Sequence, residues 1–344
     1  VAAIFVSPWF EEPVYALAWG VLAAGVVQLI FQLPFLARIH MVPTPVIDWR
    51  DEGVKKVLRL MAPAIFGVSV SQINLLLDTM IASFLPTGSI SWLYYSDRLS
   101  ELPLGVFGVA IATVILPSLS RQHTAASSEK FNATMDWALR MILLIAIPAA
   151  LALIILAEPI LLTLFYYGDV ITARDMSMST LSLRAYAVGL LAFMLIKVLA
   201  PGYFARQDMK TPVRIGVIAL VSNMVLNILL AVPLHIYWGI GHVGLALATS
   251  LSAILNAAML FFGLRKQAVY TPKPGWRKFL LMLLLGNIAM CFALYGLTTL
   301  LDDWSGWLWW ERAGCMGLVC VNGAAVYLLL LVLGGFRLSH LKNH

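Results

Sequence analysis

Long, uninterrupted apolar segments dominate this sequence. Nine of them lie at about residues 14–36, 58–84, 89–118, 134–156, 177–204, 212–233, 243–264, 278–300 and 311–334. Each is near or above the roughly 20 residues that an α-helix needs to cross a bilayer. A transmembrane barrel would instead alternate apolar and polar residues over short segments. The sequence therefore predicts an all-α polytopic membrane protein with about nine transmembrane helices in this chain.

The charged residues are few and gather between the predicted spans. Of the 344 residues, 61% are hydrophobic and 12% are charged, which excludes an ordinary soluble domain. A net charge of +6 could suit nucleic acid, but basic residues confined to short loops are better explained by membrane orientation. We therefore expect no nucleic-acid partner.

The loop charges also predict which end of each span faces the cytoplasm. If the loops alternate sides, one side carries Arg38, Arg50, Lys55, Lys56, Arg59, Arg121, Lys130, Arg206, Lys210, Arg214, Arg265, Lys266, Lys273, Arg277, Lys278, Arg337 and Lys342. The opposite side carries only Arg174 and Arg312. Because cytoplasmic loops are enriched in Lys and Arg, this asymmetry predicts a cytoplasmic C-terminus and places Val1 outside.

Three ionisable residues lie close together inside the third span, Ser89–Ser120. They are Asp97, Arg98 and Glu101. Such groups are costly at membrane depth and usually face a water-filled cavity or a charged partner. A structural Arg98–Glu101 ion pair is the simpler explanation, but it would leave Asp97 unbalanced. We therefore predict a substrate site, in which the guanidinium of Arg98 suits a phosphate or pyrophosphate.

A second polar group is spread over three predicted spans. Asn74 and Asp78 share a helix face in the second span, Asn223 and Asn227 are four residues apart in the sixth, and Thr249 lies in the seventh. Carboxylate, carboxamide and hydroxyl oxygens suit a small cation such as Na⁺. The alternative is ordinary hydrogen bonding between helices.

Other polar residues give little support for catalysis. Lys197 lies toward the inner end of the fifth span and can either reach the interface or line a cavity, whereas Arg184 and Arg140 are explained as interfacial. The histidines all lie in loops or tails, and no HExxH, GxSxG or phosphate-loop motif is present. The sequence therefore predicts a transporter without catalytic residues, not an enzyme.

Specific motifs point to one family. They are the run from Tyr94 to Pro103 (YYSDRLSELP), the run from Val114 to Ser120 (VILPSLS), the run from Tyr203 to Val213 (YFARQDMKTPV), and the run from Gly244 to Thr249 (GLALAT). With Asn223 and Asn227, these motifs resemble the MurJ (MviN) family of lipid II flippases. That family belongs to the MATE-like multidrug/oligosaccharidyl-lipid/polysaccharide exporter superfamily. The resemblance extends over essentially the whole chain.

The resemblance implies a MATE-like transporter bundle. Full family members have fourteen spans, arranged as two six-helix lobes and two added helices. Residues 1–57 would be the last helix of the N-lobe with a cytoplasmic inter-lobe linker, and residues 58–264 would be the six-helix C-lobe. Residues 265–344 would be two additional helices that form a lipid-tail groove, followed by a cytoplasmic tail. The chain opens at Val1 without an initiator Met, so we expect it to be the later part of a longer protein. Compared with full family members, this chain lacks the first five spans.

The family's activity follows as an expectation. It flips undecaprenyl-pyrophosphate-linked disaccharide-pentapeptide from the inner to the outer leaflet of the bacterial cytoplasmic (inner) membrane by alternating access. Membrane lipids and the cell-wall synthesis machinery are the other partners expected, and no cofactor is expected. By this resemblance Ser91, Asp97, Arg98 and Glu101 bind substrate, and we add Lys197 to that site.

The resemblance also implies how transport is driven. Either a sodium ion or the membrane potential would supply the coupling. The sodium ligands would be Asp78, Asn223, Asn227 and Thr249, with a backbone contribution near Leu245. Family members can have Asp where this chain has Asn227, and the loss of that carboxylate weakens the expected affinity.

Two other classes of function stay open at this stage. One is a cation-coupled drug or polysaccharide-lipid exporter of the same superfamily. A drug exporter should lack a phosphate-binding arginine. The other is a non-transporting membrane scaffold, or an enzyme such as a polyprenyl glycosyltransferase. An enzyme should carry a sizeable loop with metal ligands or bases, and the loops here are short.

Overall fold

The structure is a computed structural model that describes residues 6, 10, 12–39, 51–125, 127–167, 171–301 and 304–335. Within these ranges, the side chains of residues 13, 14, 56, 59, 60 and 62–71 are not described. The described residues form helices and connecting turns, without a strand. The all-α prediction is confirmed.

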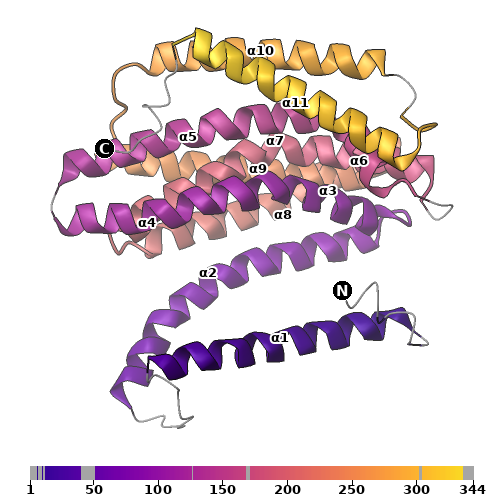
Figure 1. Cartoon of the computed structure of the whole chain (residues 1–344). Helices are drawn as coiled ribbons and strands as arrows, with labels where there is room; N and C mark the ends of the chain where they lie inside the picture. The colour runs from indigo at the N-terminus through magenta and orange to yellow at the C-terminus, as the bar shows by residue number, and fades with distance from the viewer. Residues whose placement is uncertain are drawn as a thin grey trace. The chain divides into compact units, whose positions relative to one another are not determined.

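The helices follow one another with short connections (Figure 1). They are α1 (Pro13–Arg38), α2 (Glu52–Ser83), α3 (Ser89–Pro103), the π-helical turn η3 (Leu104–Gly108), α4 (Val109–Thr124), α5 (Ser128–Ile155), α6 (Ala157–Phe165), α7 (Ala173–Phe204), α8 (Lys210–Trp238), α9 (Gly241–Lys266), α10 (Trp276–Leu300) and α11 (Trp309–Leu333).

Within the described ranges, eight helical segments are long and apolar enough to cross a membrane. They are α1, the continuous segment α3–η3–α4, α5, and each of α7 to α11. The ninth predicted span, 58–84, corresponds to α2, which is a long helix but is not among these eight. Eight of the nine predicted spans therefore correspond to helical segments that could cross a membrane, and α2 as a ninth span stays a prediction.

The chain divides into two compact units, residues 1–61 and 62–344. In the first unit, α1 exposes nearly all its apolar side chains and buries Ala16. The predicted linker at 37–57 falls largely outside the described residues, because 40–50 are not among them. The second unit holds the rest of α2 and all later helices.

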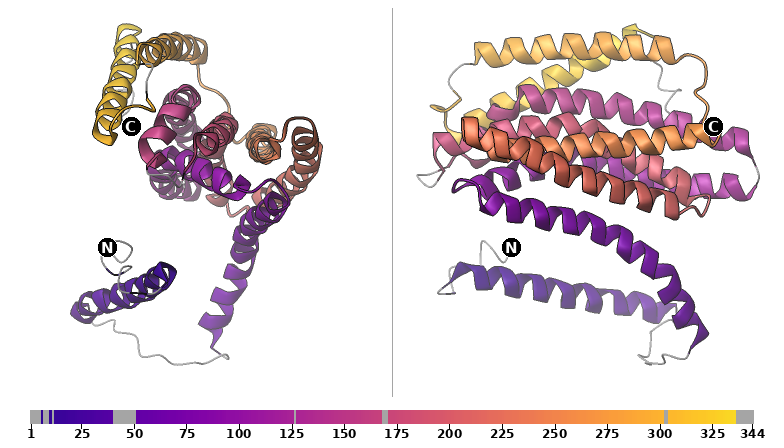
Figure 2. Two further views of the ribbon diagram at one scale, coloured as in Figure 1. Left: turned by 90° about the vertical axis from the view of Figure 1, so that its right-hand side faces the viewer. Right: turned by 180° about the vertical axis from the view of Figure 1, so that it is seen from behind.

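Helix α7 lies at the centre of the second unit, and α3, α4, α5 and α9 pack around it (Figure 2). Small residues allow backbones to approach closely, which is how membrane helices gain packing energy without a hydrophobic driving force. A Cβ on Gly189 of α7 would lie 2.7 Å from Cα of Ser250 in α9. The Ser250 hydroxyl donates to the Ala185 carbonyl at 2.7 Å. This seam fixes α9 against α7.

The third predicted span is interrupted at Pro103. Proline has no N–H for the carbonyl four residues earlier, so the α-helical ladder is broken there. The chain continues as the π turn η3, and the N–H of Val109 bonds the Leu104 carbonyl. The interruption at Pro103 is thus a π turn, a feature that often accompanies functional sites in helices.

The fourth predicted span ends where expected, but a second short helix follows it. Helix α5 stops at Ile155, and α6 runs from Ala157 to Phe165. Pro159 lacks the N–H that would bond the Ile155 carbonyl, which accounts for the interruption. The sequence pattern did not predict α6 as a separate element.

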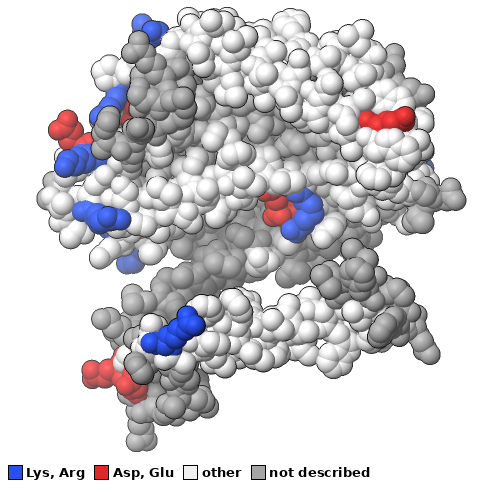
Figure 3. All heavy atoms as spheres, viewed as in Figure 1, with Lys and Arg blue, Asp and Glu red and all other residues white. Residues whose placement is uncertain are grey.

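Helices α10 and α11 pack against each other and beside α5 and α6 (Figures 1 and 2). Gly286 of α10 admits the ring of Tyr327, and Gly323 of α11 admits Leu294. Much of the surface is apolar, with many large hydrophobic side chains exposed. Figure 3 shows few charges on the face in view, most of them toward the ends of the helices. This surface suits contact with lipid.

Candidate functional site

The Arg98–Glu101 ion pair, which is the simpler alternative to the predicted substrate site, is present in α3. Arg98 Nη1 lies 2.7 Å from Glu101 Oε2, and both side chains are about half exposed. The Arg98 guanidinium also lies 5.1 Å from the ring centroid of Tyr94. Since one carboxylate and one ring use only part of the guanidinium fork, Arg98 keeps N–H groups available for an anion.

Asp97 is partly buried beside this pair. Among the described residues it has no ion-pair partner, because Arg98 is turned to Glu101. The sequence argument, that a single pair would leave Asp97 unbalanced, is borne out by this geometry. The cluster as a whole carries one net negative charge on the exposed side of α3.

Two contacts with α7 fix the first half of α3. The Ser96 hydroxyl donates to the Ser179 carbonyl at 2.8 Å, and the Trp92 indole N–H donates to Asp175 Oδ1 at 2.8 Å. Both pairs share the same sequence offset, so the two helices run parallel in register. These contacts leave the face with Arg98 and Glu101 exposed.

The two remaining residues of the predicted substrate site lie apart from the ion pair. Ser91 is exposed about two turns before Arg98 on α3. Lys197 of α7 is exposed and packs beside η3, where its Cγ lies 3.7 Å from a Cβ built on Gly108. No hydrogen bond or ion pair within the described chain joins Lys197 to the α3 cluster, so the structure does not bring it into direct contact.

The predicted cation ligands come together around Asp78 of α2. Asn227 Nδ2 donates to Asp78 Oδ1 at 2.6 Å, and the Thr249 hydroxyl lies 3.3 Å from Asp78 Oδ2. Asn223 links the two partners, accepting from Asn227 Nδ2 at 3.0 Å and donating to Thr249 Oγ1 at 3.3 Å. Three helices, α2, α8 and α9, therefore meet at one polar cluster.

Asn74 and Leu245 complete this cluster. Asn74 Nδ2 lies 3.3 Å from Asp78 Oδ2, and the Thr249 hydroxyl lies 3.1 Å from the Leu245 carbonyl. Asn74 was not among the predicted ligands, although its spacing from Asp78 placed it on the same helix face. The amide oxygens of Asn74 and Asn227 are buried and have no hydrogen-bond donor within the described chain. Buried oxygens without a donor are what a cation would satisfy.

An apolar groove of about 820 Å³ lies between α5 and α10. Its walls include Ile147, Leu151 and Ile155 from α5, and Leu284 and Phe292 from α10. A lipid-tail groove formed by the two additional helices of residues 265–344 stays a prediction, since the walls of this apolar groove come from α5 and α10. Such a surface suits a hydrocarbon chain.

Three buried polar residues were missed by the sequence reasoning. One is His242, which was expected in a loop but lies fully buried in α9 because this helix begins at Gly241. Asp136 of α5 is buried against Arg140, and Arg312 at the start of α11 is 6% exposed. The spacing of Asp136 and Arg140, four residues apart within a span, was the available signal. For Arg312 the sequence offered only a basic residue on the outer side.

Most of the sequence matches one protein family, and individual members of that family match it closely. The family described as Lipid II flippase MurJ matches residues 1–308. The chain is 52% identical to a probable lipid II flippase MurJ of Vibrio cholerae serotype O1, with 99% of the chain aligned. It is 49% identical to a probable lipid II flippase MurJ of Haemophilus influenzae, with 98% of the chain aligned. It is also 42% identical to a lipid II flippase MurJ of Burkholderia cenocepacia, with 99% aligned.

The chain covers only part of these relatives. It spans 64% of the Vibrio protein and 66% of the Haemophilus and Burkholderia proteins. What these proteins do as wholes is therefore transferred to this chain only as a proposal.

Two solved structures share the fold. A lipid II flippase MurJ in an inward closed conformation superposes with a TM-score of 0.66 at 28% identity, covering 87% of this chain and 58% of that one. An outward-facing multidrug resistance MATE family transporter of the MOP superfamily superposes with a TM-score of 0.51 at 18% identity, covering 83% and 66%. The second likeness concerns the fold alone.

Proposed function

Because this chain belongs to the MurJ family of lipid II flippases, we propose that it carries lipid II from the inner to the outer leaflet of the bacterial inner membrane. The observation that carries this proposal is an exposed guanidinium on α3 together with an apolar groove between α5 and α10, both in the second unit. The two features match an amphiphile with an anionic head and a hydrocarbon tail.

Arg98 is the residue that would bind the pyrophosphate of lipid II. A guanidinium binds phosphate oxygens in a bidentate fork, and it keeps its charge at any physiological pH. Glu101 orients Arg98 when the site is empty, and Asp97 adds negative charge that favours release once the phosphate has moved on. A drug exporter would have no use for such a phosphate-binding group, so Arg98 favours the lipid-linked substrate.

The groove between α5 and α10 would hold the polyprenyl tail. On α5 its apolar wall runs from Ile147 through Leu151 to Ile155, a distance of about 12 Å along the helix axis. A tail that stays in this groove keeps its contact with apolar surface while the head group crosses. Only the polar part of the substrate then needs the charged site on α3.

A sodium ion fits the Asp78 cluster. The residues that would hold it are Asp78, Asn74, Asn223, Asn227 and Thr249, and the donorless amide oxygens of Asn74 and Asn227 support this choice. When bound, the ion would neutralise the carboxylate of Asp78. A ligand of this kind drives transport only if it binds the inward and outward states unequally. Coupling to the membrane potential alone is the alternative outcome.

The test is a leaflet-specific assay of lipid II. Cells are depleted of their own flippase, the full-length protein is supplied, and lipid II is labelled from outside. We expect the protein to restore outer-leaflet labelling. Labelling that stays at the depleted level, with the protein present in the membrane at normal amounts, would overturn the proposal.

A further inference from the structure

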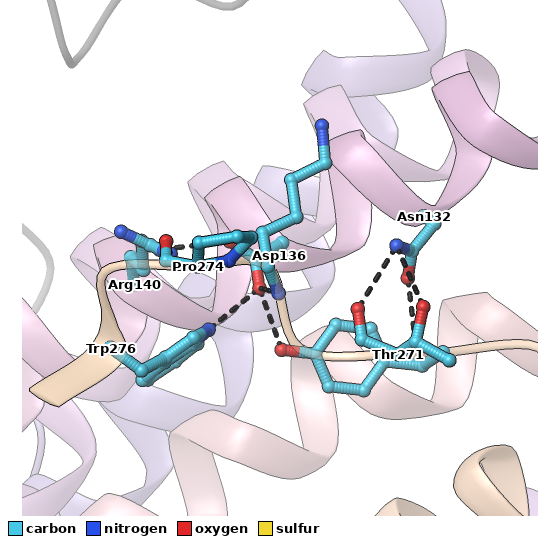
Figure 4. Close-up of polar contacts among 8 residues, drawn as sticks. Asn132, Asp136, Arg140, Thr271, Pro274 and Trp276 are labelled. Atoms are coloured by element: carbon cyan, nitrogen blue, oxygen red, sulfur yellow. Dashed lines mark hydrogen bonds and ion pairs between the residues drawn. The ribbon is translucent and has the colours of Figure 1, made fainter.

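The connector between α9 and α10, residues 267–275, is bound to the first half of α5 (Figure 4). Asp136 Oδ1 accepts hydrogen bonds from the Tyr270 hydroxyl and the Trp276 indole N–H, each at 2.8 Å, and from the Lys273 backbone N–H at 3.2 Å. Asp136 Oδ2 accepts from Arg140 Nε at 2.8 Å. We call these five residues the Asp136 hub. One buried carboxylate thus binds four donors, three of which come from the connector or the start of α10.

Arg140 extends the hub along the connector. Its Nη2 donates to the Pro274 carbonyl at 3.1 Å. Its guanidinium lies 5.0 Å from the ring centroid of Trp276 and 5.7 Å from that of Phe279 in α10. A cation between two aromatic faces adds attraction to the hydrogen bonds. The beginning of α10 is therefore held directly, not only through the connector.

Asn132 holds the connector one turn nearer the start of α5. Its Nδ2 donates to the Thr271 carbonyl at 3.0 Å, and its Oδ1 accepts from the Thr271 N–H at 2.9 Å. The side-chain amide thus satisfies both backbone groups of one residue, as a neighbouring strand would (Figure 4).

The Tyr270 hydroxyl stays a donor throughout the physiological pH range. Burial, and then its hydrogen bond to Asp136, raises the pKa of Tyr270 above its ordinary value. Because a raised tyrosine pKa favours the neutral form, this contact is complete below the ordinary tyrosine pKa. It is lost only as the pH rises through the higher value in the folded protein.

Three more hydrogen bonds fasten α11 to α5 and to the end of α6. The Tyr327 hydroxyl donates to the Leu144 carbonyl of α5 at 2.7 Å. At the other end, Arg312 Nη1 donates to the carbonyls of Leu162 and Tyr166 at 3.0 Å each, and so caps the end of α6. Hydrogen bonds therefore hold α10 and α11 to α5 and α6 at three places: at the Asp136 hub, at Leu144, and at the end of α6.

The apolar groove lies between these fastenings. Its walls are α5 and α10, which are the two helices that the Asp136 hub joins. The hydrogen bond from Trp276 to Asp136 therefore joins the two walls of the groove at the start of α10. A wall that moved away would take three of the four donors from one buried carboxylate and leave it with Arg140 of α5 alone.

We propose that α10 and α11 form a fixed wall that moves as one body with α5 and α6, and that the Asp136 hub is the positioning device that sets the width of the lipid-tail groove. This inference rests on the proposed function, since it assigns the groove to the tail of lipid II. The alternative is that the two helices act as a gate that swings away from α5 in each transport cycle.

The first experiment measures the position of the wall itself and does not require transport. Spin labels are placed at Lys130→Cys on α5 and Lys278→Cys on α10, both exposed, with Cys291, Cys315 and Cys320 replaced by alanine. We expect one narrow distance distribution in the otherwise unchanged protein, with and without lipid II, and a broad one with Asp136→Leu. A distribution that changes when lipid II is added, or one that Asp136→Leu leaves narrow, would overturn the proposal.

The second experiment separates positioning from general damage by tail length. With undecaprenyl lipid II, Asp136→Leu should lower flipping about tenfold, because a displaced wall misplaces the bound tail. With a farnesyl-linked analogue, which has little tail to hold, the variant should stay within about twofold of the unchanged protein. Equal losses on both substrates would indicate a merely structural role and overturn the inference.

Asp136→Asn is the matched control. It keeps the oxygen that accepts from Tyr270, Lys273 and Trp276, and loses the charge and the acceptor that face Arg140. We expect a smaller loss of flipping with it than with Asp136→Leu. If the unchanged protein flips neither substrate, the proposed function fails, whereas the spin-label distances still decide on the fixed wall.

Discussion

At the scale of single residues, Arg98 is the group on which substrate binding depends. A charge-assisted hydrogen bond contributes about 1.5–3 kcal/mol, so removing Arg98 should cost about 10- to 100-fold in flipping. Arg98→Ala should show the full loss. Arg98→Lys should be intermediate, because an ammonium keeps the charge but not the bidentate fork. The rate of outer-leaflet labelling of lipid II, normalised to the amount of protein, measures the effect.

Glu101 provides the control for that experiment. Glu101→Gln removes the charge that orients Arg98 but leaves the guanidinium in place. It should therefore lower flipping less than Arg98→Ala does. If Arg98→Ala and Glu101→Gln reduced flipping equally, the ion pair and not the guanidinium would be the functional unit.

Asp78 gives a prediction for stability and for ion dependence. Asp78→Leu leaves the Asn74 amide and one N–H of Asn227 without an acceptor, which should cost about 1–3 kcal/mol for each buried group left unpaired. The Thr249 hydroxyl keeps the Leu245 carbonyl as its acceptor. Asp78→Asn is nearly isosteric and should cost less. Thermal unfolding of the purified protein measures both.

The same variants test the coupling ion. In the unchanged protein, sodium should raise the melting temperature, because a ligand that binds only the folded state stabilises it. Asp78→Asn should abolish that shift while potassium serves as the salt control. A sodium-dependent shift that survives Asp78→Asn would contradict the assignment of the site.

At the scale of helices, close packing through glycine predicts where a single methyl group is not tolerated. A Cβ on Gly189 would lie 2.6 Å from Ser250 Oγ and 2.7 Å from its Cα, so α7 and α9 would have to separate. Gly189→Ala should destabilise the protein by about 1–3 kcal/mol through overpacking. The loss of thermal stability in detergent measures it.

Gly216 of α8 is the matched control for that prediction. A Cβ there meets no atom within 4 Å. Gly216→Ala should therefore raise stability by about 0.5–1 kcal/mol, because alanine loses less backbone entropy in a helix than glycine does. Equal destabilisation by both substitutions would mean that helix contact does not set the tolerance.

Element boundaries show where sequence patterns stop being informative. The long apolar runs predicted the helices of the bundle closely, since bilayer thickness imposes a minimum length. They did not predict the separate helix α6 or the π turn η3. Both features depend on which backbone carbonyls find a donor after a proline, and neighbouring helices decide that.

At the scale of the whole molecule, the loop charges predict orientation. A cysteine at Lys273 should react with a membrane-impermeant thiol reagent only after the cells are permeabilised. A cysteine at Tyr167, whose side chain is 50% exposed, should react in intact cells. The reverse pattern would contradict a cytoplasmic C-terminus.

The two polar clusters differ in how far the sequence predicted them. The family resemblance assigned one cation site to Asp78, Asn223, Asn227 and Thr249, and the structure brings these residues together. Lys197 was assigned to the substrate site, yet it packs beside η3 and makes no hydrogen bond or ion pair with the α3 cluster in the described chain. Helical spacing predicts faces of one helix but not which helices adjoin.

The sequence alone determined that this chain is a bundle of membrane-spanning helices, which way its loops are charged, and which family it resembles. Those conclusions rest on local properties: hydropathy, spacing along a helix, and motifs. Only the tertiary structure decided that α5 is a wall of the apolar groove and that Asp136 binds donors more than 130 residues away along the chain. A hydrogen bond between distant segments is set by how the helices pack, and packing depends on the shapes of all the side chains at once.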